Sequence, residues 1–157
     1  MCLRTVTDGD INEVARMWAF EQGAISIEEA QAAIAYMQSN HEKNREGHIV
    51  HLCFAVFEKG GKTIIGWCGL DGTTAGKLHI FYLIDAGYRN RGYVTQCAAK
   101  LLAYAFDEAR VPFVNGGCDK DNLASWKVME KTGMKRIGYE ENGDPFFIVD
   151  REMYLKA

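Results

Sequence analysis

The segment that most constrains the fold is residues 85–96, with the sequence DAGYRNRGYVTQ, which joins an apolar run to a long amphipathic stretch. The run before it, residues 77–84, predicts a strand because most of its side chains are apolar. The stretch after it predicts a helix that begins at Gly92, with a buried stripe of Val94, Cys97, Ala98, Leu101, Leu102 and Ala105. A strand that leads through a glycine-containing loop into a helix predicts an α/β fold, with the helix N-terminus facing the loop.

The rest of the chain predicts the element order βααβββαβαββ, which gives a single α/β domain over residues 1–157. We expect a mixed central sheet flanked by about four helices, because strand and helix patterns alternate through the second half of the chain. Capping-box spacing at Asp10 with Glu13 and at Ser26 with Glu29 marks two helix starts. The predicted strands cover residues 3–6, 49–57, 63–70, 77–84, 111–114, 134–139 and 146–154. The predicted helices cover residues 10–20 and 122–131 and begin at residues 26 and 92.

Composition limits the class of protein. Hydrophobic residues make up 48% of the chain and charged residues 25%, which is typical of a globular domain. There is no apolar stretch of ~20 residues and no apolar signal segment, so we expect no membrane span.

The five cysteines are scattered without a CxxC pair, which favours reduced thiols and a cytoplasmic protein. A homodimer is compatible with the sequence, which does not fix the number of copies.

Charge is unevenly distributed along the chain. The net charge is −3, yet residues 87–136 contain nine basic and five acidic side chains, so this segment is +4 and the remainder is −7. Such an asymmetry suggests an anionic ligand on one side and a cationic ligand on the other. Chance scatter of solvated charges is the alternative. We expect no nucleic-acid partner, because the chain is acidic overall and has no tract of mixed basic and aromatic residues.

The loop at residues 85–92 has the composition of an anion site. The unpaired N–H groups and the positive dipole end of the following helix favour a phosphate, and Thr95, Arg89 and Arg91 add donors and charge. Gly87 and Gly92 have Walker A spacing, but the required Lys-Ser/Thr does not follow them, and no GxGxxG occurs. The remaining pattern is Arg-x-x-Gly-x-Val. An ordinary helix start with two solvated arginines is the alternative.

This pattern resembles the Gln/Arg-x-x-Gly-x-Gly/Ala signature of the GNAT N-acetyltransferase superfamily, whose loop binds the pyrophosphate of acetyl-CoA. Residues 122–134, NLASWKVMEKTGM, resemble the second motif of the branch that contains ribosomal-protein N-terminal alanine and serine acetyltransferases. The element order also matches, so the resemblance covers nearly the whole chain. The sequence departs from the family pattern in several places: Val94 replaces Gly or Ala, His79 replaces a Glu, and Met129 replaces a Tyr of other branches. Smaller departures are Ala86 for a Pro, Phe81 for a Gly and Met134 for a Phe.

The resemblance implies a fold with a splayed strand pair and a set of cofactor contacts. A bulge in the strand near Leu83 and Ile84 would splay it from residues 111–114, and the backbone of these two residues would pair with the pantetheine amides of acetyl-CoA. The implied pyrophosphate contacts come from Arg89, Asn90, Arg91, Gly92, Tyr93, Val94 and Thr95. Asn122 would contact the pantetheine, and Lys131, or Lys127 one turn before it, a CoA phosphate. A helix N-cap and a solvated helix face are the alternatives for these last residues.

The implied chemistry is attack of a primary amine on the thioester in a ternary complex. Ser125 is the candidate acid for the thiol and His79 the candidate base, with Asp85 and Tyr82 as weaker base candidates. The alternatives are an ordinary first-turn serine and a sheet-surface histidine. We expect no metal, because His48 and His51 would point to opposite faces of a strand. Cys118 is expected to be a small buried thiol and not a nucleophile.

The predicted acceptor is a cationic primary amine. By resemblance, its pocket would be shaped by the loop with Glu21 and by the hairpin with Glu140, Glu141 and Asp144, and walled by Trp18, Phe20, Phe146 and Phe147. A peptide N-terminus, a polyamine and an amino sugar all fit. Two other hypotheses stay open on the same fold: a non-catalytic acyl-CoA-binding module, and an interaction protein that has lost the cofactor.

Overall fold

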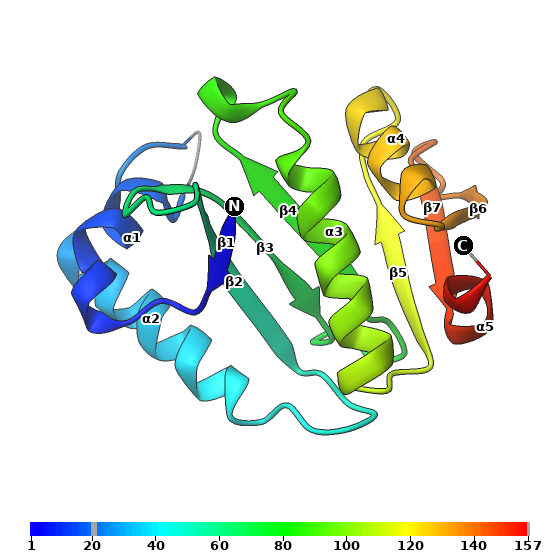
Figure 1. Cartoon of the computed structure of the whole chain (residues 1–157), viewed down its shortest axis with the longest axis horizontal. Helices are drawn as coiled ribbons and strands as arrows, with labels where there is room; N and C mark the ends of the chain where they lie inside the picture. Colours follow the sequence, from blue (N-terminus) through cyan, green and yellow to red (C-terminus); the bar gives the residue numbers. More distant parts are fainter. Residues whose placement is uncertain (20–21, 157) are drawn as a thin grey trace.

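The computed structural model describes residues 1–19 and 22–156, and these form one mixed seven-stranded sheet with helices on both faces (Figure 1). The strands are β1 (Cys2–Arg4), β2 (His51–Phe57), β3 (Ile64–Asp71), β4 (His79–Ile84), β5 (Phe113–Gly117), β6 (Lys135–Tyr139) and β7 (Pro145–Asp150). Their order across the sheet is β1-β2-β3-β4-β5-β7-β6. The mixed α/β architecture predicted from the sequence is thereby confirmed.

Five α-helices occur within the described residues, which is one more than the sequence predicts. They are α1 (Ile11–Met17), α2 (Ile27–His41), α3 (Tyr93–Ala103), α4 (Leu123–Lys131) and α5 (Arg151–Leu155), and a π-helical turn, η4 (Tyr104–Glu108), extends α3. The predicted last strand is wrong beyond Asp150, where α5 begins. The Asp150 carboxylate accepts a hydrogen bond from the Met153 amide at 2.8 Å, so an N-cap ends the strand and starts the helix.

Helix starts elsewhere also depend on side-chain caps. Ser26 and Glu29 form the predicted capping box at the start of α2. At α1 the prediction is wrong, because Asp10 accepts from the Thr7 amide at 2.9 Å and caps a short 3-10 turn, η1 (Asp8–Asp10), instead of pairing with Glu13. The Arg4 guanidinium, 2.7 Å from the Asp10 carboxylate, holds the pKa of that carboxyl down to about 2.

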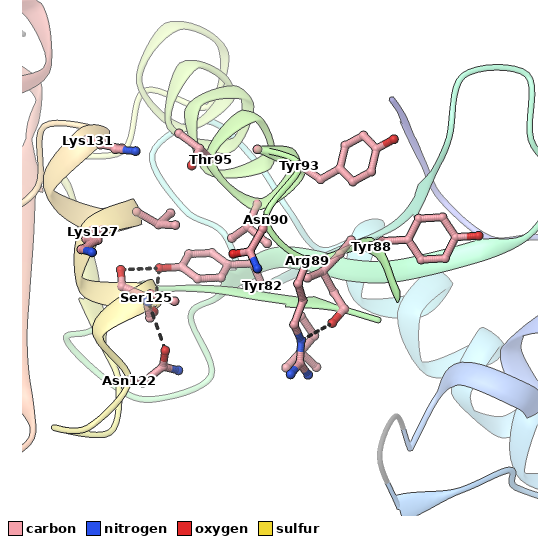
Figure 2. A pocket seen from close by; sticks show the side chains of 16 residues that line it. Tyr82, Tyr88, Arg89, Asn90, Tyr93, Thr95, Asn122, Ser125, Lys127 and Lys131 are labelled. Carbon is pink, nitrogen blue, oxygen red and sulfur yellow. Dashed lines mark hydrogen bonds between the residues drawn. The ribbon is translucent and has the colours of Figure 1, made fainter. Parts of the chain in front are cut away.

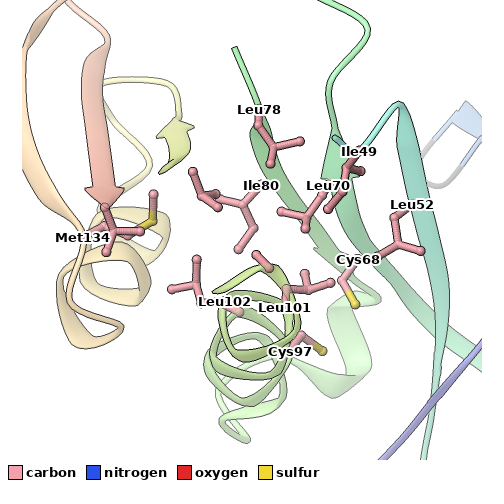
Figure 3. Packing of buried hydrophobic residues seen from close by; sticks show 14 of the residues in the cluster. Ile49, Leu52, Cys68, Leu70, Leu78, Ile80, Cys97, Leu101, Leu102 and Met134 are labelled. Atoms are coloured by element: carbon pink, nitrogen blue, oxygen red, sulfur yellow. The ribbon is translucent and has the colours of Figure 1, made fainter. Parts of the chain in front are cut away.

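The sheet is buried on both faces over its central strands. All residues of β3 except Asp71 are buried, which explains its continuous apolar sequence. One core cluster lies between the sheet and α3, where Leu70 and Ile80 meet Leu101 and Leu102 (Figure 3). The other core cluster packs α1 and α2 on the opposite face. No helix in residues 1–19 or 22–156 is long and apolar enough to cross a membrane.

Strands β4 and β5 run parallel and then separate, which confirms the predicted splayed pair (Figure 1). Among the described residues the two strands are paired only at His79 and Asn115. There the Asn115 amide donates to the Leu78 carbonyl at 2.7 Å. The predicted bulge is wrong, because β4 stays in regular register with β3 from His79 to Ile84. The separation arises because β4 remains paired with β3 while β5 remains paired with β7.

Candidate functional site

A cavity of about 830 Å³ opens where β4 and β5 separate, between the loop before α3 and the first turns of α4 (Figure 2). We call it the loop cavity. It brings together every predicted cofactor-binding residue except Arg91, and it also includes the candidate acid Ser125. These lining residues are Leu83, Ile84, Arg89, Asn90, Gly92, Tyr93, Val94, Thr95, Asn122, Lys131 and Ser125. Residues that are distant in the sequence therefore form one site.

The loop backbone that lines this cavity is shaped to present N–H groups. Asn90 and Gly92 both adopt left-handed conformations, with φ of 62° and 75°. A Cβ at Gly92 would meet nothing closer than the side-chain nitrogen Nε2 of Gln96 at 3.8 Å, so glycine is needed there for its conformation and not for space. The first bond of α3 runs from the Gln96 amide to the Gly92 carbonyl at 3.1 Å. The amides of residues 93–95 therefore precede the helical ladder and are available to an anion.

Side-chain contacts fix the loop on its outer side. The Asp85 carboxylate accepts from the Gly87 amide at 2.9 Å, so this weaker base candidate acts as a turn cap. The Tyr93 hydroxyl donates to Glu58 at 2.9 Å, and the Arg91 guanidinium lies 3.7 Å from the same carboxylate. Arg91 thus points to the hairpin between β2 and β3 and does not line the loop cavity. The predicted contact between the Arg91 side chain and a cofactor is not tested here, and this placement of the side chain does not favour it.

The α4 wall supplies polar groups and positive charge. The Asn122 side chain accepts from the Ser125 amide at 3.1 Å, which confirms Asn122 as the helix N-cap. The Ser125 hydroxyl is buried and lies 2.9 Å from the Tyr82 hydroxyl (Figure 2). Lys127 and Lys131 line the same wall, opposite Arg89. Among the described residues that line the loop cavity, three are cationic and none is a carboxylate.

Met129, which by the resemblance stands where other branches of the family carry a tyrosine, is part of the core here. Met129 is 1% exposed, and a Cβ at Gly116 would lie 2.7 Å from its sulfur. The side chain therefore fills space under β5 and presents no hydroxyl group to the loop cavity. Any proton donor for a thiol in this cavity must come from another residue.

A second cavity of about 460 Å³ lies near the start of β4 and contains His79. We call it the acidic cavity, because its described lining includes Asp119, Glu140 and Asp144 but no lysine or arginine. Cys118 and Phe146 also line it. The structure therefore places the two predicted catalytic residues, His79 and Ser125, in different cavities.

The environment of His79 favours the neutral imidazole. Burial lowers its pKa below the usual value, and nearby Lys77 acts in the same direction, while Asp71 and Glu140 oppose them. Asp71 is the register partner of His79 on β3, and His51 is the register partner of Asp71 on β2. This arrangement gives His79 the protonation state that a base requires near neutral pH.

Other predictions about this region need correction. Cys118 is half-buried and not buried, and its thiol pKa is raised by burial, so the reactive thiolate is disfavoured. Phe147 is fully buried in the core and cannot wall a pocket, and Trp18 packs edge-on against Trp67 at 5.6 Å. The predicted pocket residues Phe20 and Glu21 lie outside the described residues. Within residues 1–19 and 22–156, no group of three His, Cys, Asp or Glu side chains is arranged to hold a metal ion.

Comparison with known protein families assigns the chain to one of them. The acetyltransferase (GNAT) domain family matches residues 1–135, which is most of the sequence. The chain therefore belongs to the GNAT acetyltransferase family. Use of acetyl-CoA is implied by this membership.

Curated relatives carry the same family designation. The chain is 28% identical to "Probable N-acetyltransferase YjcK" of Bacillus subtilis over 116 residues, which cover 72% of this chain and 61% of that protein. It is 33% identical to "Uncharacterized N-acetyltransferase YnaD" of the same organism over 60 residues, covering 38% of this chain and 35% of that protein. The matched region thus spans between about a third and three fifths of these relatives.

Solved structures share the fold at low sequence identity. A ribosomal-protein-S5-alanine acetyltransferase from Vibrio fischeri superposes with a TM-score of 0.81 at 16% identity, over 96% of this chain and 92% of that chain. A spermidine N-acetyltransferase SpeG chimera from Vibrio cholerae and hSSAT gives a TM-score of 0.75 at 15% identity, over the full length of both chains. These likenesses establish the fold and leave the acceptor open.

Proposed function

We propose that this protein is an acetyl-CoA-dependent N-acetyltransferase that moves an acetyl group to a primary amine by direct attack in a ternary complex. The observation that carries this proposal is the loop cavity, where a helix N-terminus and three cationic side chains meet the separated strands β4 and β5. Family membership supports acetyl-CoA as the acetyl donor. The acceptor and the catalytic roles rest on the geometry of this chain together with the resemblance of its motifs to the family.

The lining of the loop cavity fits both ends of a CoA molecule. A pyrophosphate is anionic, and the amides of residues 93–95 together with Arg89, Lys127 and Lys131 offer it donors and charge. The pantetheine arm carries amides that need backbone partners. The β4 backbone at Leu83 and Ile84 lies beyond the point where β5 leaves, so it offers such partners in the manner of an added strand. The Ile84 carbonyl already accepts a long bond from Arg89 Nε at 3.4 Å, which an incoming amide would have to replace.

The residues of this chain orient the two substrates and donate or accept the protons that move during the reaction. As the amine nitrogen attacks the thioester carbon, the C–S bond breaks and the sulfur must gain a proton. Ser125, buried in the wall of the loop cavity, is our candidate donor to sulfur. His79, neutral in the acidic cavity, is our candidate acceptor of the ammonium proton, acting through water because it lies in the neighbouring cavity.

The acidic cavity is our candidate acceptor site. Its three carboxylates and the Phe146 ring suit a cationic amine with some apolar body. A peptide N-terminus, a polyamine and an amino sugar share this chemistry. One structural neighbour is named as a ribosomal-protein-S5-alanine acetyltransferase and another as a spermidine N-acetyltransferase, so both kinds of amine occur on this fold.

A non-catalytic acyl-CoA-binding module is the second candidate. It is favoured by three departures from the pattern that the resemblance implies: Met129 is buried where other branches carry a tyrosine, His79 replaces a Glu, and Val94 replaces a Gly or Ala. Such a module would use the loop cavity in the same way and would leave the acidic cavity without a catalytic role.

The test is release of free thiol from acetyl-CoA with a panel of amines and N-terminal peptides, each at low and high salt, beside calorimetric titration with CoA. We expect turnover of cationic amines, with kcat/KM falling as salt screens the acidic cavity. CoA binding without turnover of any amine would favour the binding module. Absence of CoA binding would contradict both functions.

A further inference from the structure

Two hydroxyl groups from distant parts of the sequence meet in the wall of the loop cavity. Tyr82 extends from β4, and Ser125 lies in the first turn of α4. The phenol oxygen of Tyr82 is 2.9 Å from Ser125 Oγ and 3.4 Å from the Ser125 carbonyl oxygen (Figure 2). Both side chains line the loop cavity, so the pair faces the space where a thioester would be held.

The surroundings keep Tyr82 protonated, and either hydroxyl can donate the hydrogen bond between them. Burial raises the pKa of Tyr82 above its usual value, although the hydrogen bond to Ser125 opposes this, so Tyr82 is a protonated donor near neutral pH. The amide of Ser125 is bonded to Asn122, which holds the serine backbone in place. When Tyr82 donates to Ser125 Oγ, the serine proton is directed away from Tyr82, and both the Cys118 thiol, which the Ser125 side chain also contacts, and a thiolate held in the cavity can accept it.

Acidity explains why the pair is more useful than Ser125 alone. An aliphatic hydroxyl is a far weaker acid than a thiol, so a lone serine protonates a thiolate poorly. A phenol, with an ordinary pKa of ~10, is far closer to a thiol at ~8.5 than an aliphatic hydroxyl is, and this order holds although burial raises the pKa of Tyr82. A proton that passes from Tyr82 through Ser125 to sulfur therefore comes from a much better matched acid.

We propose that Tyr82 is a positioning residue that supplies, through Ser125, the proton taken up by the leaving thiolate; this inference rests on the function proposed above. As the C–S bond breaks, sulfur takes the bonding electron pair and the Ser125 proton, and Ser125 Oγ takes the proton of Tyr82. The Tyr82 phenolate then takes a proton from solvent, and solvent takes up the proton that the attacking nitrogen loses. The net transfer is one proton from nitrogen to sulfur. Met129, buried beside Gly116, leaves no competing phenol at the usual position on α4.

The kinetic test is Tyr82→Phe, which removes one oxygen and keeps the ring. We expect kcat to fall by about 10- to 100-fold with less than about a twofold change in KM for acetyl-CoA, because general acid catalysis contributes ~10²–10⁴-fold and water can replace part of it. Ser125→Ala should lower kcat at least as much, and the double variant should be no slower than Ser125→Ala, since the two residues act as one unit. Tyr104→Phe, in the helical turn after α3, is the matched control and should leave kcat unchanged.

A second measurement does not require turnover: the pKa of the CoA thiol when bound, read from thiolate absorbance. A hydroxyl pair that donates to the thiolate lowers that pKa, so Tyr82→Phe should raise it while Tyr104→Phe leaves it unchanged. If CoA binds but no amine is acetylated, the proposed function fails and this titration still decides the inference. Equal thiol pKa values in wild type and Tyr82→Phe, additive kinetic losses, or absence of CoA binding would each overturn it.

Discussion

The loop cavity and the acidic cavity share strand β4 and differ in charge. The loop cavity lies at the carboxyl end of the strand and is lined by Arg89, Lys127 and Lys131. The acidic cavity lies at its amino end and is lined by Asp119, Glu140 and Asp144. One strand therefore separates a site suited to an anion from a site suited to a cation, which is how an enzyme can hold acetyl-CoA and an amine without mixing their charges.

The two cavities also differ in what builds them. The loop cavity depends on backbone conformation, with left-handed residues at Asn90 and Gly92 before α3. The acidic cavity depends on side chains of the hairpin between β6 and β7, where Asp144 accepts from the Lys120 amide at 2.9 Å. We conclude that backbone changes should damage cofactor binding, while loss of single charges should alter the preference for acceptors.

The largest effect is expected at Gly92. Gly92→Asp places a carboxylate against the proposed pyrophosphate position in a left-handed conformation, and should weaken CoA binding by about 100-fold or more, or roughly 2.7 kcal/mol. Gly92→Asn has the same size, tolerates this conformation and is neutral, so its loss should be about tenfold or less. Calorimetric titration of both variants with CoA gives the comparison. Equal affinity of Gly92→Asp and wild type would show that the anion site is elsewhere.

A smaller effect is expected at the acidic cavity. Glu140→Gln removes one exposed carboxylate, so KM for a cationic amine should rise by about fivefold with CoA affinity unchanged. Glu141→Gln is the matched control, because Glu141 is also exposed but does not line the cavity. Steady-state kinetics at low salt measures both. Identical KM values for the two variants would remove Glu140 from the acceptor site.

The smallest effect is expected on stability. Burial lowers the pKa values of His51 and His79, so the unfolded chain binds more protons than the folded chain just below pH ~6.5. The free energy of unfolding should therefore rise with pH across that window. His79→Gln should make this rise with pH less steep. His48→Gln, which replaces an exposed histidine, is the control and should leave the slope unchanged. Urea titrations at several pH values measure it, and a fall in stability as pH rises through the window would contradict the expected sign.

The sequence predicts correctly those features that depend on residues close together in the chain. The capping box at Ser26 and the strand–loop–helix unit around Gly92 depend on neighbouring residues, and the structure has them as predicted. For Asn122 the structure has the N-cap that was the alternative to a cofactor contact. Helix α5 was missed because the alternating pattern of β7 runs directly into Asp150, whose capping role overrides it.

Features that depend on contacts between distant segments could not be predicted from the sequence. The direction of Arg91 depends on Glu58 in a distant hairpin, and the separation of His79 from Ser125 depends on where β5 leaves β4. Tyr82 and Ser125 are 43 residues apart, so their contact had no local signal. The one available hint was strand parity, because Tyr82 shares the face of Ile80 and Ile84, which pack toward α3.

The central claim is that the two cavities bind different ligands, and backbone amide NMR during titration with CoA tests it most directly. The account predicts that the largest shift changes fall on residues 90–95 and on the end of β4, with much smaller changes at residues 140–146. Largest changes at residues 140–146, or saturating CoA without changes at residues 90–95, would contradict it.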